Sequence, residues 1–177
     1  MPILTSRMTK WNKLRSEMKI IGIDPGLHAT GYGLIEVELN QPGRIKFLEA
    51  GAIEPKPDDL LQHRINKIYD CLTGIISEYR PVVMVLERLY SHYRHPTTAC
   101  KLGHVRGVIC LVCAHQNIEL VEHSVKRIRK NVVGDGNASK QQTREVVAHL
   151  LKIGASRLTL DASDALALAL GYAFMRR

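Results

Sequence analysis

Two short apolar runs, each ending in a carboxylate, most constrain how this chain can fold. The runs are K-I-I-G-I-D, which ends at Asp24, and V-V-M-V-L-E, which ends at Glu87. Both are rich in β-branched residues and are bounded by Pro or Gly, a pattern typical of buried parallel strands. A helical crossover between them would place the two strands parallel in one sheet. If they are neighbours, Asp24 and Glu87 end side by side.

A second pair of acids, Asp161 and Asp164, lies in the helical pattern D-A-S-D-A-L-A-L-A-L. Residues three apart share one face of a helix. We expect this last helix to begin near Asp161, with both acids in its first turn, where the helix dipole favours negative charge. Clustered acids repel one another and are costly to desolvate, so folds tolerate them mainly around a hard cation such as Mg²⁺. The first hypothesis is therefore a metal-dependent phosphoryl-transfer site.

Hydrolysis of a phosphodiester by two metal ions requires three or four Asp or Glu ligands around cations roughly 3.5 to 4 Å apart. One ion lowers the pKa of a water and the other stabilises the leaving 3′ oxygen. No Ser, Cys or His nucleophile is then needed, and the chain has no G-x-S-x-G motif. The four acids would be both the catalytic residues and the metal ligands.

Each acid also has a purely structural interpretation. Asp161 could be a helix N-cap and Asp164 a first-turn acid. Asp24 could be a turn residue before Pro-Gly, and Glu87 could pair with a neighbouring arginine such as Arg88 or Arg106. A single sheet topology that brings all four acids toward one edge favours the functional interpretation.

The pattern of the remaining chain predicts one α/β domain. Three strands at about 19–24, 31–38 and 44–53 are expected to be antiparallel, because tight turns join them. Next come a helix after Pro57 with an Asp available as N-cap, a strand at 82–87, a helix at about 97–116 and a strand at 118–121. Helices at about 124–131, from Ser139 to about Lys152, and from Asp161 complete the chain. This order predicts a five-stranded mixed sheet with its fourth and fifth strands parallel to the first and helices on both faces, the outline of an RNase H-like fold.

Charge favours an acidic partner. The net charge is +8 with a pI of about 9.5, and half of the excess lies in residues 1–19. The remaining positive charge is concentrated between residues 124 and 144, which suits a nucleic-acid backbone better than a membrane. This strip contains Lys126, Arg127, Arg129, Lys130, Lys140 and Arg144 against Asp135.

Residues 18–177 are expected to form a single domain, preceded by a peripheral extension over residues 1–17. Met18 stands immediately before the first strand and is an alternative start. No secretory signal is recognised, so the expected location is the cytoplasm. The four cysteines have no zinc-site spacing and are interpreted as reduced core thiols.

Several motifs in order resemble RuvC-type Holliday junction resolvases over about residues 18–175. They are I-D-P-G-L-H-A-T-G-Y-G from Ile23, V-L-E ending at Glu87, K-L-G-H-V-R-G-V from Lys101, V-V-G-D-G from Val132, Lys140, and D-A-S-D-A-L-A-L-A from Asp161. The resemblance implies an RNase H-like homodimer that binds a four-way DNA junction and nicks two opposed strands symmetrically, in homologous recombination and DNA repair. It also implies two Mg²⁺ ions per site, replaceable by Mn²⁺, and a branch-migration motor complex as a partner.

The resemblance also assigns roles to single residues. The family's catalytic, metal-binding acids fall on Asp24, Glu87, Asp161 and Asp164. The aromatic that stacks on a base near the junction centre falls on Tyr90, and phosphate contacts fall on Lys126, Arg129 and Lys140.

The chain departs from the family pattern at several positions. Tyr90 stands where Phe is common, and the loop from Ser91 to Thr98 is longer than usual. Asp135 adds a negative charge to a basic neighbourhood, the segment before Asp161 lacks the usual Pro, and residues 1–17 have no counterpart.

Two other classes of function compete with a resolvase. Actin-like ATPases share the D-x-G opening but need a second phosphate loop and roughly twice this length. A non-catalytic binder of branched DNA could keep the fold, although the complete set of acids argues against it. The apolar helix at 105–116 is either a dimer interface or simply part of the core.

Overall fold

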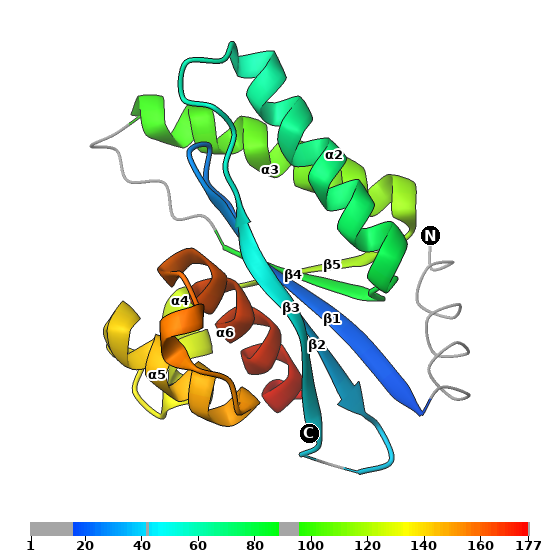
Figure 1. Ribbon diagram of the computed structural model, residues 1–177, viewed down its shortest axis with the longest axis vertical. Helices are drawn as coiled ribbons and strands as arrows, with labels where there is room; N and C mark the ends of the chain where they lie inside the picture. Colours follow the sequence, from blue (N-terminus) through cyan, green and yellow to red (C-terminus); the bar gives the residue numbers. More distant parts are fainter. Residues whose placement is uncertain (1–15, 42, 89–95, 177) are drawn as a thin grey trace, which may run out of the picture.

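The computed structural model describes residues 16–41, 43–88 and 96–176 of the 177-residue chain. A five-stranded sheet with the order β3-β2-β1-β4-β5 runs through its centre (Figure 1). Its strands are β1 (Glu17–Asp24), β2 (Thr30–Glu38), β3 (Ile45–Ile53), β4 (Val83–Glu87) and β5 (Glu119–His123). The first three strands are antiparallel, β4 pairs parallel with β1, and β5 pairs parallel with β4. The predicted mixed sheet is confirmed.

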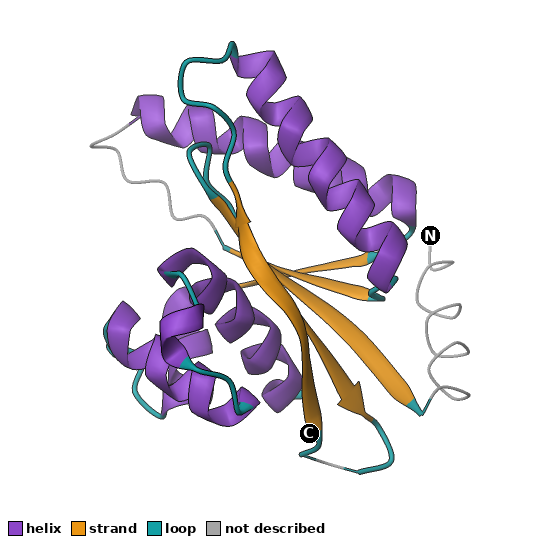
Figure 2. Ribbon diagram, viewed as in Figure 1, coloured by secondary structure: helices purple, strands orange, loops and turns teal. Residues whose placement is uncertain are grey.

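Helices cover both faces of the sheet (Figure 2). They are α2 (Leu61–Tyr79), α3 (Pro96–Gln116), α4 (Val125–Val133), α5 (Lys140–Leu151) and α6 (Leu160–Met175), with a 3₁₀ turn at Ala155–Arg157. Because side chains alternate along a strand, β1 supplies a separate core on each face. Ile21 packs with α2 and α3, whereas Ile20 packs with α4, α5 and α6.

The helix starts follow local capping chemistry, with two corrections. Ser139 begins α5 with a complete capping box, as predicted. The predicted Asp cap of α2 is wrong, because that helix begins after Leu60 and has no side-chain cap. Thr159, not Asp161, caps α6, since its hydroxyl accepts a hydrogen bond from the amide of Ala162. One acid therefore lies in the first turn instead of two.

Helix α6 packs directly on the backbone of the central strands, because glycines face it there. A Cβ at Gly22 of β1 would overlap the carbonyl oxygen of Ala165 and lie 2.9 Å from the amide nitrogen of Ala169. A Cβ at Gly31 of β2 would overlap the carbonyl oxygen of Asp161. The missing side chains let the start of α6 approach the strand end that carries Asp24.

Helix α3 is buried on one side and apolar on the other. Val105, Ile109 and Val112 are buried against the sheet side, whereas Leu111 is 47% exposed. In the described part of the chain, the segment Thr97–Gln116 is the one helix with the length and mean hydropathy, 1.2, of a membrane span. Its buried side belongs to the core of this domain. Its outer side carries Gly107, Cys110, Leu111 and Ala114 in the middle, with Lys101, His104 and His115 toward the ends.

The cysteine prediction is only partly correct. All four cysteines are free, but Cys100 and Cys110 are exposed on α3 and are not core residues. Cys113 is buried, and burial raises the pKa of its thiol to about 12.

The N-terminal extension and the loop from Ser91 to Thr98 lie mostly outside the described residues. The described chain begins at Ser16, whose carbonyl accepts a hydrogen bond from the amide of Leu39. Glu17 already pairs with Glu38 in the sheet, and Met18 is buried in the core.

Candidate active site

Two neighbouring parallel strands end in acids, as predicted. Ile23 of β1 is in register with Leu86 of β4, so Asp24 and Glu87 follow on adjacent strand ends. Buried apolar residues precede both acids, and this rigid packing fixes where the two carboxylates emerge.

Asp24 lies in a strongly negative environment. Burial, followed by the charges of Glu87 and Asp164, raises the pKa of Asp24 to about 7, and a hydrogen bond with Glu87 contributes to the same shift. The nearby charge of Lys140 opposes it. Asp24, Glu87 and Asp164 therefore act on one another electrostatically at one end of the sheet.

Asp161 reaches this neighbourhood from the first turn of α6. Its backbone lies against Gly31, which pairs directly with Asp24 across the β1–β2 ladder. Its charge also contributes to raising the pKa of Lys140. The structure thus brings all four predicted acids to one edge of the fold.

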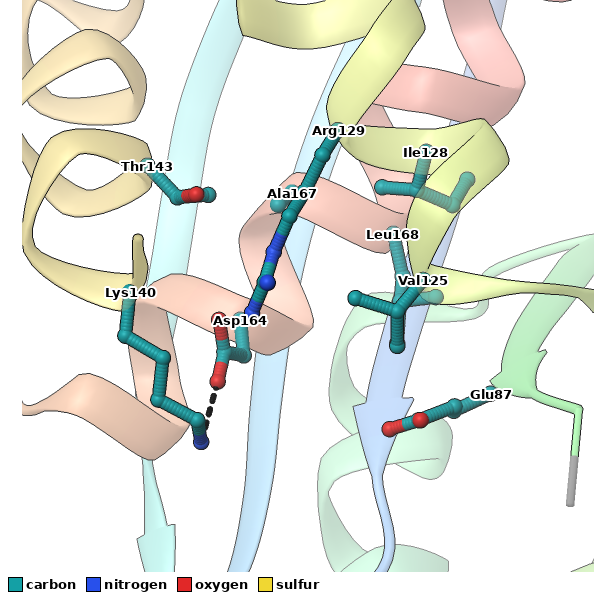
Figure 3. A pocket seen from close by; sticks show the side chains of 9 residues that line it. All are labelled: Glu87, Val125, Ile128, Arg129, Lys140, Thr143, Asp164, Ala167 and Leu168. Atoms are coloured by element: carbon teal, nitrogen blue, oxygen red, sulfur yellow. Dashed lines mark ion pairs between the residues drawn. The ribbon is translucent and has the colours of Figure 1, made fainter. Parts of the chain in front are cut away.

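Lys140, at the start of α5, forms an ion pair with Asp164. The Nζ–Oδ2 distance is 2.5 Å, and the side chains are 51% and 16% exposed respectively (Figure 3). Burial alone would lower the pKa of Lys140, but its hydrogen bond to Asp164 and the charges of Asp164, Asp24 and Asp161 raise it. The lysine is therefore a positive charge placed within the acid cluster.

A cleft of about 270 Å³ opens beside this ion pair. One part of its wall is apolar and comes from α4 and α6, and the rest is polar. Figure 3 shows Glu87 pointing into the cleft from the side opposite Lys140, and Arg129 running from α4 toward Asp164. The lining residues are Glu87, Val125, Ile128, Arg129, Lys140, Thr143, Asp164, Ala167 and Leu168.

The predicted DNA-binding residues divide into three groups. Arg129 and Lys140 line the cleft. Lys126 is exposed on α4 beside Gly136 and lies outside the cleft lining. Tyr90 lies outside the described residues. Asp135, which was noted for its negative charge, accepts a hydrogen bond from the amide of Asn137 and stabilises the loop between α4 and α5.

Two further residues lie near the site: Arg106, which the sequence offered only as a structural partner for Glu87, and Thr143, which it did not indicate. Arg106 donates a hydrogen bond to the carbonyl oxygen of Glu87 and forms an ion pair with Glu122. The alternative in which Arg106 neutralises the carboxylate of Glu87 is therefore wrong, and the arginine instead holds the end of β4. Thr143 is fully buried in the cleft wall, where its hydroxyl donates to the carbonyl of Ser139. Helical spacing from Lys140 could have indicated Thr143.

The donor set suits a hard divalent cation, although the side chains are not drawn together around one. Within the described ranges, no group of three or more His, Cys, Asp or Glu side chains is arranged to hold a metal ion. The available donors are all carboxylates, and burial together with the charges of Glu87 and Asp164 raises the pKa of Asp24 despite the opposing charge of Lys140. Such a site gains from a cation with oxygen ligands.

The pKa of Asp24 predicts a specific dependence of stability on pH. Because this pKa is about 7 in the folded protein and about 3.8 in the unfolded chain, the folded state binds the proton more tightly. In EDTA, the free energy of unfolding should therefore fall between about pH 4 and pH 7, relative to Asp24→Asn, by roughly 1 to 3 kcal/mol. Urea titrations of both proteins across this range measure the difference. If the difference in the free energy of unfolding between the two proteins does not change with pH, the environment assigned to Asp24 is wrong.

Comparison with known proteins identifies the family. The family model described as crossover junction endodeoxyribonuclease RuvC matches residues 20–172. The chain belongs to the RuvC family. A RuvC protein from Legionella pneumophila strain Lens is 36% identical over 157 residues, covering 89% of this chain and 87% of the relative. A RuvC protein from Bradyrhizobium diazoefficiens is 38% identical over 168 residues, covering 93% and 91%.

A solved RuvC structure supports the fold assignment. Thermus thermophilus RuvC, determined in complex with a Holliday junction substrate, matches with a TM-score of 0.82 and 23% identity, covering 90% of this chain and 95% of that chain. The RNase H-like fold is therefore confirmed. RuvC-family membership also confirms the predicted enzyme class, a metal-dependent endodeoxyribonuclease.

Proposed function

We propose that this RuvC-family chain resolves four-way DNA junctions by nicking two opposed strands symmetrically, in homologous recombination and DNA repair. The observation that carries this proposal is the electrostatic coupling of Asp24 with Glu87 and Asp164 beside a cleft lined by Arg129 and Lys140. Carboxylates that can bind cations and basic side chains that can bind phosphates thus lie together at one place in the fold.

Asp24, Glu87, Asp161 and Asp164 would hold two Mg²⁺ ions, with Mn²⁺ as a substitute. When bound, the ions supply Lewis acidity to the attacking water and to the leaving 3′ oxygen. To serve as ligands, Asp24 would have to be ionised and Asp164 would have to separate from Lys140. Lys140, which is half exposed, is then free to contact a phosphate of the DNA.

The basic strip between residues 124 and 144 would position the DNA through its phosphates. Arg129 lies in the cleft wall, and Lys126 lies on the exposed side of the same helix. Contacts of this kind fix the register of a duplex without reading its sequence.

Tyr90 would stack on a base at the junction centre, as its family position implies. Tyr90→Ala should therefore reduce cleavage more than binding. We expect the activation free energy of cleavage to rise by about 1 to 3 kcal/mol, the range for loss of base stacking. Tyr90→Phe, which keeps the ring, is the control. Single-turnover cleavage and junction affinity are measured for both variants, and equal losses in cleavage and affinity for Tyr90→Ala would refute the stacking role.

A second copy of the chain would cover the outer face of α3 and form the homodimer. The support is the exposed apolar surface around Leu111, together with the family resemblance. A two-fold dimer also suits a junction with two-fold symmetry.

We further propose a branch-migration motor as a partner and the cytoplasm as the location.

Leu111→Glu should weaken this dimer at least about 10-fold, because it places a charge in an apolar interface. Leu150→Glu is the matched control, since Leu150 is 39% exposed on α5, away from the proposed interface. Sedimentation equilibrium measures both variants. Equal association of the wild type and Leu111→Glu would exclude α3 as the interface.

Incubation of the purified protein with a mobile four-way junction and Mg²⁺ tests the function. Paired nicks at symmetric positions in opposed strands are expected. Binding without nicking would instead indicate a passive junction-binding protein, and cleavage that does not distinguish junctions from duplexes would exclude a resolvase.

A further inference from the structure

The loop between β1 and β2 is held by a buried arginine from another element. This loop, residues 25–29, follows Asp24 directly and projects beyond the sheet (Figure 1). Arg64, in the first turns of α2, donates a hydrogen bond from Nη2 to the carbonyl oxygen of Leu27 over 2.9 Å. Arg64 is only 9% exposed. It therefore ties the loop next to the active site to the helix layer that lies opposite α5.

The positive charge of Arg64 lacks an anionic partner in the described part of the chain. None of the ion pairs among residues 16–41, 43–88 and 96–176 involves it, and the first turn of α2 contains no acid. Its Nε is buried without a hydrogen-bond partner. A buried charge is ordinarily compensated by an opposite charge, because desolvation is otherwise costly. The positive charge of Arg64 is therefore uncompensated and would favour an anion bound at the adjoining loop.

His28, which is exposed at the tip of the loop, extends this site outward. Nη2 of Arg64 lies 3.4 Å from Nδ1 of His28. A guanidinium has only donors, so Nδ1 must be the acceptor in this contact. The proton of a neutral His28 ring is then on Nε2, the nitrogen that faces away from Arg64. The pair presents a positive charge from α2 and an outward N–H donor from the loop.

We propose that His28, with the positive charge of Arg64 behind it, binds one phosphate of the DNA strand that enters the active site. The inference rests on the proposed function and adds a contact on the α2 side of the sheet. Lys140 and Arg129 act from α5 and α4 on the other side. The strand would thus be held by phosphate contacts on both sides of the acid cluster, which resists its rotation about a single anchor.

His28→Ala tests the proposal at an exposed residue. The affinity for an uncleaved junction in Ca²⁺ should fall roughly 3-fold to 10-fold, as for loss of one phosphate hydrogen bond. In phosphate-ethylation interference, one phosphate of the strand to be cut should interfere with binding of the wild type but no longer with binding of His28→Ala. His63→Ala is the control, because His63 is exposed on the same helix one residue before Arg64. Unchanged affinity and an unchanged interference pattern for His28→Ala would overturn the proposal.

Arg64→Gln gives a second, independent readout. Removing one phosphate-neutralising charge should reduce the slope of log affinity against log salt by about 0.9. Circular dichroism identifies any unfolding of this variant, and His28→Ala decides the outcome in that case. An NMR shift of the His28 amide with inorganic phosphate but not with junction DNA would overturn the assignment to DNA. Wild-type junction cleavage with no effect of His28→Ala would refute this inference while leaving the proposed function intact.

Discussion

Asp24→Asn should abolish Mg²⁺-dependent nicking of a four-way junction while leaving junction binding in Ca²⁺ intact. Asp24 is buried within reach of the charges of Glu87, Asp164 and Lys140, which all act on its pKa, and this indicates a central position among the acids. Asn has nearly the same shape but lacks the negative charge that a cation ligand supplies. We expect a loss in rate of at least about 10³-fold, which corresponds to about 4 kcal/mol of transition-state stabilisation.

The matched control for Asp24→Asn is Asp70→Asn. Asp70 is exposed on α2, where it accepts a hydrogen bond from the side chain of Asn66, so its replacement changes the net charge equally without touching the site. Single-turnover cleavage and gel-shift affinity are measured for both variants. Full cleavage by Asp24→Asn would refute the assignment of the metal site, whereas a parallel loss of binding would indicate a folding defect.

Gly22→Ala should destabilise the protein strongly and disable the site at the same time. The added methyl, fixed directly to the strand backbone, would overlap the carbonyl oxygen of Ala165, which is fixed in the backbone of α6. The structure can relax only if α6 moves away from β1, which would carry Asp161 and Asp164 away from Asp24. Overpacking typically costs 1 to 3 kcal/mol, and a clash between backbones belongs at or above about 3 kcal/mol.

Gly74→Ala is the control for this prediction. Gly74 lies inside α2, and a Cβ there meets nothing within 4 Å. Alanine at this position should stabilise the protein by about 0.5 to 1 kcal/mol, because it favours the helix over the unfolded chain. Urea denaturation measures both variants. Wild-type stability and wild-type cleavage for Gly22→Ala would contradict the direct packing of α6 on the strand.

The sequence predicted the fold well where local patterns and chain topology agree. The runs before Asp24 and Glu87 identified adjacent parallel strands, and Ser139 identified the start of α5. Helix starts with competing polar residues were harder to predict. Thr159 and Asp161 both suit an N-cap, and only the backbone path at the end of the preceding loop determined that Thr159 is used.

The contacts within the site were less accessible to sequence reasoning. The ion pair of Lys140 with Asp164 joins the starts of two helices, and their separation depends on how α5 packs against α6. Sequence motifs indicated Lys140 as a phosphate contact but could not show its partner in the protein without DNA. The exposure of Cys110 was missed for a similar reason, since an apolar helix pattern does not show which of its sides is covered.

The direct contact between α6 and the strands has a consequence for the directed evolution of this enzyme. A library that randomises Gly22 or Gly31 would yield few folded members, because the adjoining atoms are backbone and no compensating side-chain change can make room for a methyl group. Useful diversity in metal preference must therefore come from the side chains around the acids. The short distance between α6 and the sheet thus requires glycine at these two positions.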